Sequence, residues 1–266
     1  MSRKRLCPLF AGAGRSPMKI CHIITDLDTG GAEIMLLNLL RCMDRAAFAP
    51  QVISLTSVGL IGKQIESLGI PVRALGMRRG VPDPRGMFRL ARLLRRDRPS
   101  VIQTWMYHAN LLGGLAAKRA GKIPVAWGIH HTTLDPRENK KTTIWTAKLC
   151  GRLSGWLAQR IVCCAEATRE LHVEQGYAAD KMLVIPNGFD LERFKPDPEA
   201  RRSVRKELEV APDTPLIGLM ARYHAQKDHH NFVQAAARLH EKLPETRFLL
   251  CGDGVTWDLS LIHISE

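Results

Sequence analysis

The stretch Lys19-Ile-Cys-His-Ile-Ile-Thr25, which runs directly into Asp26-Leu-Asp-Thr-Gly-Gly-Ala-Glu33, decides the fold of this chain. Its first part is a short apolar run, which is typical of a buried strand. Residues Ala32–Met43, which begin at the end of the glycine pair, have the spacing of an amphipathic helix. A strand that passes through a glycine turn into a helix is the repeating unit of a parallel sheet.

The same alternation continues to about residue 185. Further strands are predicted at Gln51–Leu55, Pro71–Leu75, Val101–Thr104, Pro124–Ile129, Arg160–Ala165 and Met182–Ile185. Helices are predicted between them at Ile61–Leu68, Arg85–Arg96, Ala109–Ala120, Thr142–Leu157 and Glu166–Gln175. Because no hairpin turn interrupts this order, we expect an α/β fold, with a parallel sheet covered by helices on both faces.

The composition changes after this first domain. Pro186-Asn-Gly188 is typical of a turn, and Phe194-Lys-Pro-Asp-Pro198 of a linker. A second strand–helix–strand unit is predicted at Leu216–Met220, His230–Leu243 and Arg247–Cys251. We therefore expect a disordered leader at 1–17, a first domain at 18–186 and a crossing segment and linker at 187–213. The start of a second domain is expected at 214–254 and a non-native tail at 255–266, while both Met1 and Met18 are candidates for the natural start.

Composition limits the classes of function. The chain of 266 residues is 45% hydrophobic and carries a net charge of +13, which favours anionic partners without choosing among them. Nucleic-acid binding has only this charge in its favour, so we expect no nucleic acid partner. Seven scattered cysteines, an odd number, predict reduced thiols in a cytoplasmic protein. No apolar run is long enough for a membrane span, and no signal peptide is recognisable.

Ligands of open parallel sheets bind beyond the carboxyl ends of the strands, so the residues after each strand are candidates. Gly30 and Gly31 open the first helix, where backbone N–H groups favour an anion, although a plain tight turn explains the pair equally well. His108 follows the predicted strand Val101–Thr104, and His130 follows the next strand. Two histidines at neighbouring strand ends can donate hydrogen bonds or handle protons in one cleft.

The stretch from Gly218 to Phe232 brings cations and histidines together after the first strand of the second unit. Arg222 offers a planar fork of donors and Lys227 a mobile charge, which suit a diphosphate. His229 and His230 are adjacent and diverge on a helix, so a metal site is disfavoured. A solvated basic helix start remains an alternative.

At this point the residues resemble the retaining glycosyltransferases of family 4, which have the GT-B fold of two Rossmann-like domains. The resemblance extends from about Met18 to Gly254, and its motifs occur in the family's order. The matching segments are Gly30-Gly-Ala-Glu33, Trp105–Asn110, Gly128-Ile-His-His131, Ile185-Pro-Asn-Gly-Phe-Asp190 with Phe194 and Pro196, Arg222 with Lys227, and Gly252-Asp-Gly254.

The resemblance implies transfer of a sugar from a nucleotide-diphosphate sugar to a glycan or lipid-linked acceptor, with retained anomeric configuration and without a metal or other cofactor. It implies a catalytic role for His130 and, more weakly, for His108. Arg222, Lys227, Gly30 and Gly31 would bind the donor phosphates. Glu33, Asn187, Gly252 and Gly254 would line the substrate cleft. Polysaccharide biosynthesis in the cytoplasm is the expected setting by analogy with the family.

Two departures from the family's pattern qualify this interpretation. Ala165 stands where the family commonly has a serine. The acidic pair that contacts the donor sugar and ribose would lie beyond Gly254, so we expect the natural gene to be longer and this chain to be an inactive fragment. The alternative is a non-catalytic module that binds an acceptor, a lipid or a partner.

Six arginines lie between Arg85 and Arg98, with Asp97 as their only acidic neighbour in that stretch. A solvated helix face is the simpler explanation. Docking on anionic lipid is the functional one, and it would place the protein peripherally at the inner face of the membrane.

Overall fold

The structure, a computed structural model, describes residues 16–78, 83–137 and 139–254. It divides into two compact units, Met1–Phe189 and Asp190–Glu266, each of which is described by itself. Most of the leader expected at 1–17 and all of the tail expected at 255–266 lie outside the described residues.

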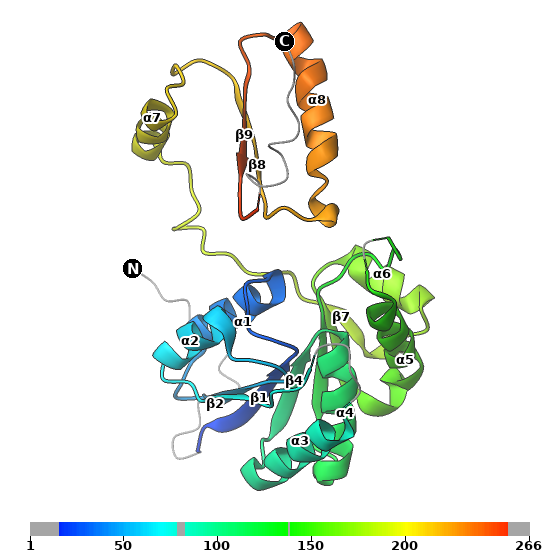
Figure 1. Ribbon diagram of the computed structural model, residues 1–266. Helices are drawn as coiled ribbons and strands as arrows, with labels where there is room; N and C mark the ends of the chain where they lie inside the picture. Colours follow the sequence, from blue (N-terminus) through cyan, green and yellow to red (C-terminus); the bar gives the residue numbers. More distant parts are fainter. Residues whose placement is uncertain (1–15, 79–82, 138, 255–266) are drawn as a thin grey trace. The chain divides into compact units, whose positions relative to one another are not determined.

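The first unit is a seven-stranded parallel sheet with the strand order β3-β2-β1-β4-β5-β6-β7 (Figure 1). Its strands are β1 (Met18–Ile24), β2 (Phe48–Ser54), β3 (Val72–Ala74), β4 (Val101–Trp105), β5 (Val125–Ile129), β6 (Arg160–Cys163) and β7 (Met182–Val184). Its helices are α1 (Gly31–Cys42), α2 (Gly59–Ser67), α3 (Pro84–Asp97), α4 (Tyr107–Gly121), α5 (Lys141–Leu157) and α6 (Glu166–Glu174), and a 3-10 turn, η2 (Ala179–Lys181), precedes β7. The predicted α/β fold is confirmed.

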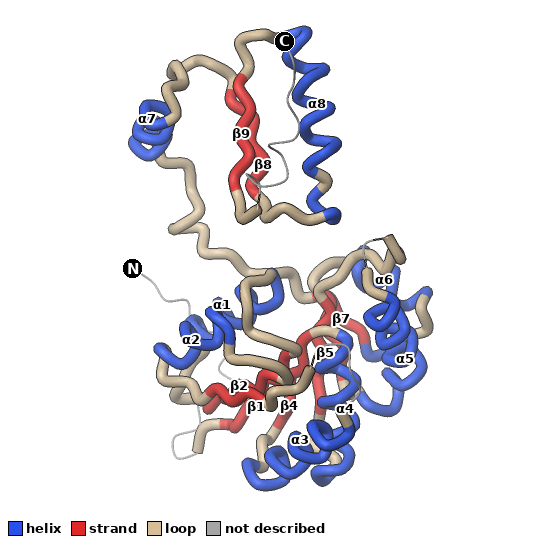
Figure 2. Tube along the Cα trace, viewed as in Figure 1, coloured by secondary structure: helices blue, strands red, loops and turns tan. Residues whose placement is uncertain are grey.

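Two apolar cores lie on opposite faces of this sheet, because successive strand residues point to opposite sides. Ile23 packs into the core under α3, α4 and α5, whereas its neighbour Ile24 packs into the core under α1 and α2. Figure 2 shows α1 and α2 on one side of the strands and α3 and α4 on the other. Helices on both faces leave the strand ends as the part of the sheet that is open to a ligand.

The strand order reverses direction between β1 and β4. From β1 the chain moves outward through β2 to β3, and then returns to place β4 on the other side of β1. The loops after β1 and β4 therefore diverge, and such a reversal is where open parallel sheets bind ligands. Gly30 and His108 follow these two strands, and His130 follows β5.

The second unit contains α7 (Pro198–Glu207), β8 (Leu216–Met220), the 3-10 turn η3 (Ala225–Lys227), α8 (His229–Lys242) and β9 (Arg247–Cys251). β8 and β9 pair in parallel, and α8 connects them. Helix α7 lies within the segment 187–213, which the sequence predicted as a linker. Asp197 caps it by accepting hydrogen bonds from the backbone of Glu199 and Ala200, and buried Arg205 donates to the carbonyls of Ala211 and Thr214.

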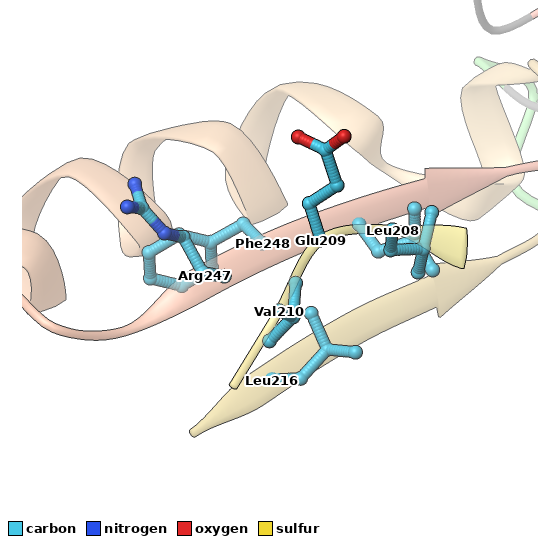
Figure 3. Close-up of a pocket in the computed structure, with 7 residues that line it drawn as sticks. Leu208, Glu209, Val210, Leu216, Arg247 and Phe248 are labelled. Carbon is cyan, nitrogen blue, oxygen red and sulfur yellow. The ribbon is translucent and has the colours of Figure 1, made fainter. Parts of the chain in front are cut away.

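A shallow cavity of about 330 Å³ lies in the second unit (Figure 3). It is lined by Leu208, Glu209, Val210, Leu216, Arg247, Phe248 and Leu249. Leu216 and Arg247 are the first residues of the two parallel strands. The cavity is therefore at the opposite end of the sheet from Arg222, and it is not part of the predicted phosphate site.

Candidate functional site

The glycine turn after β1 forms the start of α1. Gly30 is the N-cap residue in an extended conformation, and no side chain caps the helix there. A Cβ added to Gly30 would lie 2.2 Å from Oε2 of Glu33, so the Glu33 carboxylate is folded back against this turn. A Cβ on Gly31 would meet nothing within 4 Å. The anion-binding surface predicted for this turn is therefore open at Gly31 and partly covered by Glu33 at Gly30.

The loops after β4 and β5 are joined through the carbonyl of Gly128. That carbonyl accepts hydrogen bonds from the backbone N–H of Met106 (3.0 Å) and from the side-chain amide of Asn110 (3.3 Å). Thr104 Oγ1 in turn donates to Asn110 Oδ1 at 2.6 Å, in the buried interior. Met106 has a φ of 72°, an uncommon conformation for a residue with a side chain. The two histidine-bearing loops are thus a single hydrogen-bonded structure.

His130 stacks on Trp105. The ring centroids are 5.1 Å apart and the ring planes differ by 7°. Trp105 is buried, and its indole N–H donates to Nδ1 of His22 at 3.4 Å. Burial lowers the pKa of His130, and the neighbouring His131 lowers it further. The His130 imidazole is therefore held in its neutral form, which has one donor and one acceptor nitrogen.

His131 faces a second aromatic residue of the β4 loop. Tyr107 meets its ring edge-on, with centroids 5.7 Å apart. The Tyr107 hydroxyl lies 2.8 Å from Nε2 of His172, whose Nδ1 lies 2.6 Å from the carbonyl oxygen of Thr168. A carbonyl only accepts, so Nδ1 of His172 carries the proton and the tyrosine hydroxyl donates to Nε2. These residues fix the inner side of the histidine loop.

His108 is the second residue of α4 and is partly buried. Burial lowers its pKa, so it too is held neutral. The structure places it on the same loop-to-helix turn as Trp105 and Tyr107, which contact His130 and His131. Asn187 lies beyond β7 on an exposed segment just before the end of the first unit.

Arg222 and Lys227 lie beyond the carboxyl end of β8, and both side chains are exposed. Within the described ranges, no carboxylate forms an ion pair with either of them. Lys227 ends the turn η3, and Asp228 behind it caps α8 by accepting from the backbone of Asn231. Two unpaired cations therefore stand beside a helix N-terminus, where an anion is favoured.

Gly252 and Gly254 lie directly beside this basic loop. A Cβ on Gly252, whose φ is 154°, would lie 2.1 Å from the carbonyl oxygen of Ala221 and 2.9 Å from the backbone nitrogen of Arg222. The backbone N–H of Tyr223 donates to the carbonyl of Asp253 at 2.8 Å. The structure thus brings together the residues that the sequence predicted after β8 and after β9.

The histidines and cysteines of the chain are the candidate ligands for a metal ion. In the part of the chain that the structure describes, no three histidine, cysteine, aspartate or glutamate side chains are grouped to hold a metal ion. Nδ1 of His224 accepts from the backbone of Gln226, and buried His229 lies 3.3 Å from the carbonyl of Ala221. Those two histidines shape the basic loop. The described cysteines are free thiols.

Sequence reasoning missed four residues that support the histidine loops of the first unit: His22, Trp105, Tyr107 and His172. Nothing in the sequence marks His22 or His172 as part of a site, because each is a buried residue within its strand or helix. Trp105 and Tyr107 lie in the segment Trp105–Asn110 that was matched from the sequence to a histidine-bearing loop. The available clue to their role was an aromatic residue at a strand end, close to a histidine.

No described helix is both long and apolar enough to cross a membrane.

Comparison with known proteins adds a family to this geometry. Residues 29–193 match the family described as Glycosyltransferase Family 4. The Bacillus subtilis protein EpsF is 26% identical over 246 residues, which cover 90% of this chain and 63% of EpsF. The Escherichia coli UDP-Gal:alpha-D-GlcNAc-diphosphoundecaprenol alpha-1,3-galactosyltransferase is 25% identical over 177 residues, 65% of this chain and 46% of that protein.

The solved structure of Anabaena HepE in complex with UDP-glucose has a TM-score of 0.73 and 22% identity, and the match covers 91% of this chain and 63% of that one. This likeness supports the predicted GT-B-like fold. The chain thus spans less than two thirds of the length of EpsF and of HepE. Because the family match extends over more than half of its residues, the chain belongs to glycosyltransferase family 4.

Proposed function

We propose that this chain takes part in transferring a sugar from a nucleoside-diphosphate sugar to a glycan or lipid-linked acceptor, with retention of anomeric configuration. The proposal rests on one observation above all. Arg222 and Lys227 are exposed and lack ion pairs in the described residues, and they stand at a strand end beside the start of α8. A leaving diphosphate carries the charge that such a group of donors stabilises.

The chemistry assigns a task to the candidate residues of each unit. The bond between the anomeric carbon and the diphosphate oxygen breaks, and its electron pair leaves with the diphosphate. An acceptor hydroxyl oxygen forms the new bond on the same face of the sugar and gives up its proton to an oxygen of the departing diphosphate. Arg222 and Lys227 neutralise the departing diphosphate, and neutral His130 hydrogen-bonds the sugar. His108 has the weaker assignment, on the acceptor side.

The relatives support the classes of donor and acceptor. HepE has been crystallised with UDP-glucose, and the Escherichia coli relative is named for a UDP-galactose donor and a diphosphoundecaprenol-linked acceptor. We therefore propose a UDP-hexose donor and a lipid-linked glycan acceptor in polysaccharide biosynthesis. Because protein cations supply the positive charge, the proposal includes no metal or other cofactor. Turnover that persists in EDTA would support this part, and loss of turnover restored by Mg²⁺ would contradict it.

Donor binding gives the most direct test. Calorimetric titration with UDP should show binding that weakens roughly 10- to 100-fold in Arg222→Ala, because a charge-assisted hydrogen bond is lost. Lys227→Ala should have an effect of the same order, and Arg222→Lys should fall between, since it lacks the planar fork. Arg238→Ala removes an exposed cation from the later part of α8 and serves as the matched control. Equal affinity in all four variants would contradict the assignment.

Turnover separates an enzyme from a binding module. The chain is incubated with UDP-hexoses and a lipid-linked acceptor, and the anomeric configuration of any product is read by NMR. A product with the donor's configuration supports retention, and an inverted product refutes it. Inactivity of this chain on its own stays a prediction, which the same assay measures. Absence of both UDP binding and product would favour the non-catalytic alternative, which needs no donor.

We also propose peripheral contact with anionic membrane through α3. Arg89, Arg92 and Arg96 are exposed on this helix, which buries Leu90 and Leu94 on its other side. The chain should sediment together with phosphatidylglycerol vesicles, and this binding should be lost when these three arginines become Gln. A matched variant with Gln at Arg201, Arg202 and Arg238, which are exposed arginines of the second unit, should still bind. Equal loss in both variants would reduce the contact to net charge.

A further inference from the structure

One tryptophan and two histidines lie side by side in the first unit: His22 on β1, Trp105 on β4 and His130 directly after β5. Trp105 on β4 pairs with Ile24 on β1 and with Gly128 on β5. Residues two apart on a strand share a face, so His22 on β1 is its diagonal neighbour on one side. On the other side His130, the residue directly after β5, stacks on it with ring centroids 5.1 Å apart. The strand register therefore places Trp105 between a buried histidine and the histidine assigned to the sugar.

Trp105 is buried and is held in place by hydrogen bonds. Its side chain is 4% exposed and that of His22 is 1% exposed. The indole N–H donates to Nδ1 of His22, and the backbone just after Trp105 is tied to the carbonyl of Gly128 by the N–H of Met106. The tryptophan ring therefore has a fixed orientation.

His130, in contrast, has little else to fix its ring. Its Nδ1 is buried without a hydrogen-bond partner, and across the described ranges no hydrogen bond reaches either ring nitrogen. The stack on Trp105, at 5.1 Å and 7°, is within the range of roughly 4.5–7 Å in which aromatic rings attract. Gly128 lies beside this ring, since an added Cβ would be at the ordinary contact distance of 3.7 Å from Nε2 of His130.

We propose that Trp105 is a positioning residue for His130. It holds the imidazole plane by stacking, and His22 in turn holds the tryptophan. The proposal rests on the proposed function for its consequence in catalysis, but the stack itself can be measured without turnover. This role of Trp105 differs from core packing, because replacing Trp105 should then change the orientation of the His130 ring and not only the stability of the fold.

The experiment compares Trp105→Leu, Trp105→Phe and Trp156→Leu with the unmodified chain. Trp156 is an exposed tryptophan on α5 and serves as the matched control. Histidine labelled with ¹³C and assigned with His130→Ala reports the ring-current shift and the ring mobility of His130 by NMR. Thermal unfolding shows whether each variant is folded, and kcat and KM are measured where turnover is found.

In Trp105→Leu we expect the His130 signals to lose their ring-current shift and the ring to become mobile. The kcat should fall about 100-fold, since a misplaced group can cost that much, while the donor KM changes little. Trp105→Phe should restore the fixed ring and most of kcat, and Trp156→Leu should change neither. A His130 ring that stays fixed in folded Trp105→Leu would overturn the proposal, as would a phenylalanine variant that resembles the leucine one.

The two proposals fail in different ways. A fixed, shifted His130 ring that depends on Trp105, in a protein that neither binds UDP nor transfers a sugar, would remove the proposed function and leave the positioning contact. Turnover in a protein whose His130 ring is unaffected by replacing Trp105 would remove the positioning contact and leave the proposed function. If Trp105→Leu does not fold, the phenylalanine variant and His22→Leu, which removes the indole's acceptor, give the same NMR readout.

Discussion

Acidification should unfold the first unit partly through His22. This imidazole is fully buried, and burial lowers its pKa from 6.5 to about 4. In the unfolded chain the imidazole binds a proton near its ordinary pKa, so the unfolded state takes up protons first as the pH falls. The free energy of unfolding is therefore unaffected above pH 6.5 and declines between 6.5 and about 4.

The size of this loss follows from the pKa difference. At about 1.4 kcal/mol per pKa unit, complete protonation of the unfolded state alone costs about 3 kcal/mol. Down to about pH 5 the loss is about 2 kcal/mol, which is a large part of the stability of an ordinary domain. Histidines 108, 130, 131 and 172 also have lowered pKa values, so they add losses of the same sign.

Urea titrations at about pH 7.5 and about pH 5 measure this effect. Tryptophan fluorescence reports mainly the first unit, which contains four of the five tryptophans, Trp105, Trp127, Trp145 and Trp156. His22→Phe should be less stable at the higher pH, because the Trp105 indole loses its acceptor. Its further loss on acidification should be smaller than that of the unmodified chain by about 2 kcal/mol.

The control is His240→Phe, which removes an exposed histidine from the second unit and should leave the drop unchanged. An equal pH-dependent loss in His22→Phe and in the unmodified chain would refute the reasoning. So would an NMR titration in which the His22 ring protonates near 6.5 in the folded state.

Three further predictions concern the second unit. Gly252→Ala should displace the loop before Arg222 and weaken UDP binding measured by calorimetry, since its Cβ would lie 2.1 Å from the carbonyl oxygen of Ala221. The control Gly218→Ala should leave UDP binding unchanged, because its Cβ would lie 3.5 Å from the nearest atom, the carbonyl oxygen of Leu249. Asp197→Ala removes the cap of α7 at a cost of about 1 kcal/mol, seen as faster amide exchange confined to that helix. Arg205→Met should cost about 1–3 kcal/mol in a thermal melt, because the carbonyls of Ala211 and Thr214 lose their charged donor; an unchanged melt would contradict this.

The sequence predicted the sheet well because buried parallel strands are short apolar runs that little else resembles. It failed at α7 for the opposite reason. Seven of the ten residues Pro198–Glu207 are polar, so no apolar stripe marks a helix. The sequence does contain a signal for the start of a helix, because Asp197 is a capping residue and Pro198 a first-turn proline. The same two residue types are also typical of a linker. Arg205, a charged residue, makes the contact that holds the helix.

The candidate site divides along a similar line. That histidines would lie at neighbouring strand ends followed from alternation alone, because parallel strands end at one edge of the sheet. Which side chain would hold which histidine depended on strand order and register. Trp105 lies 83 positions from His22 in sequence, and the two meet only because β4 returns to the side of β1. Sequence patterns carry no record of that return.

Charge shows the same limit and how structure removes it. A net charge of +13 predicts an anionic partner but spreads that prediction over 39 basic residues. The structure assigns several of them to other tasks: Arg73 and Arg96 pair with Asp97, and Arg205 holds two carbonyls. Arg222 and Lys227 have no such pairing in the described ranges, and their loop is fixed by contacts of the main chain with residues 251 and 253. A rigid loop with unpaired cations keeps its electrostatic attraction for a ligand, which is why these two residues are the strongest candidates for binding a diphosphate.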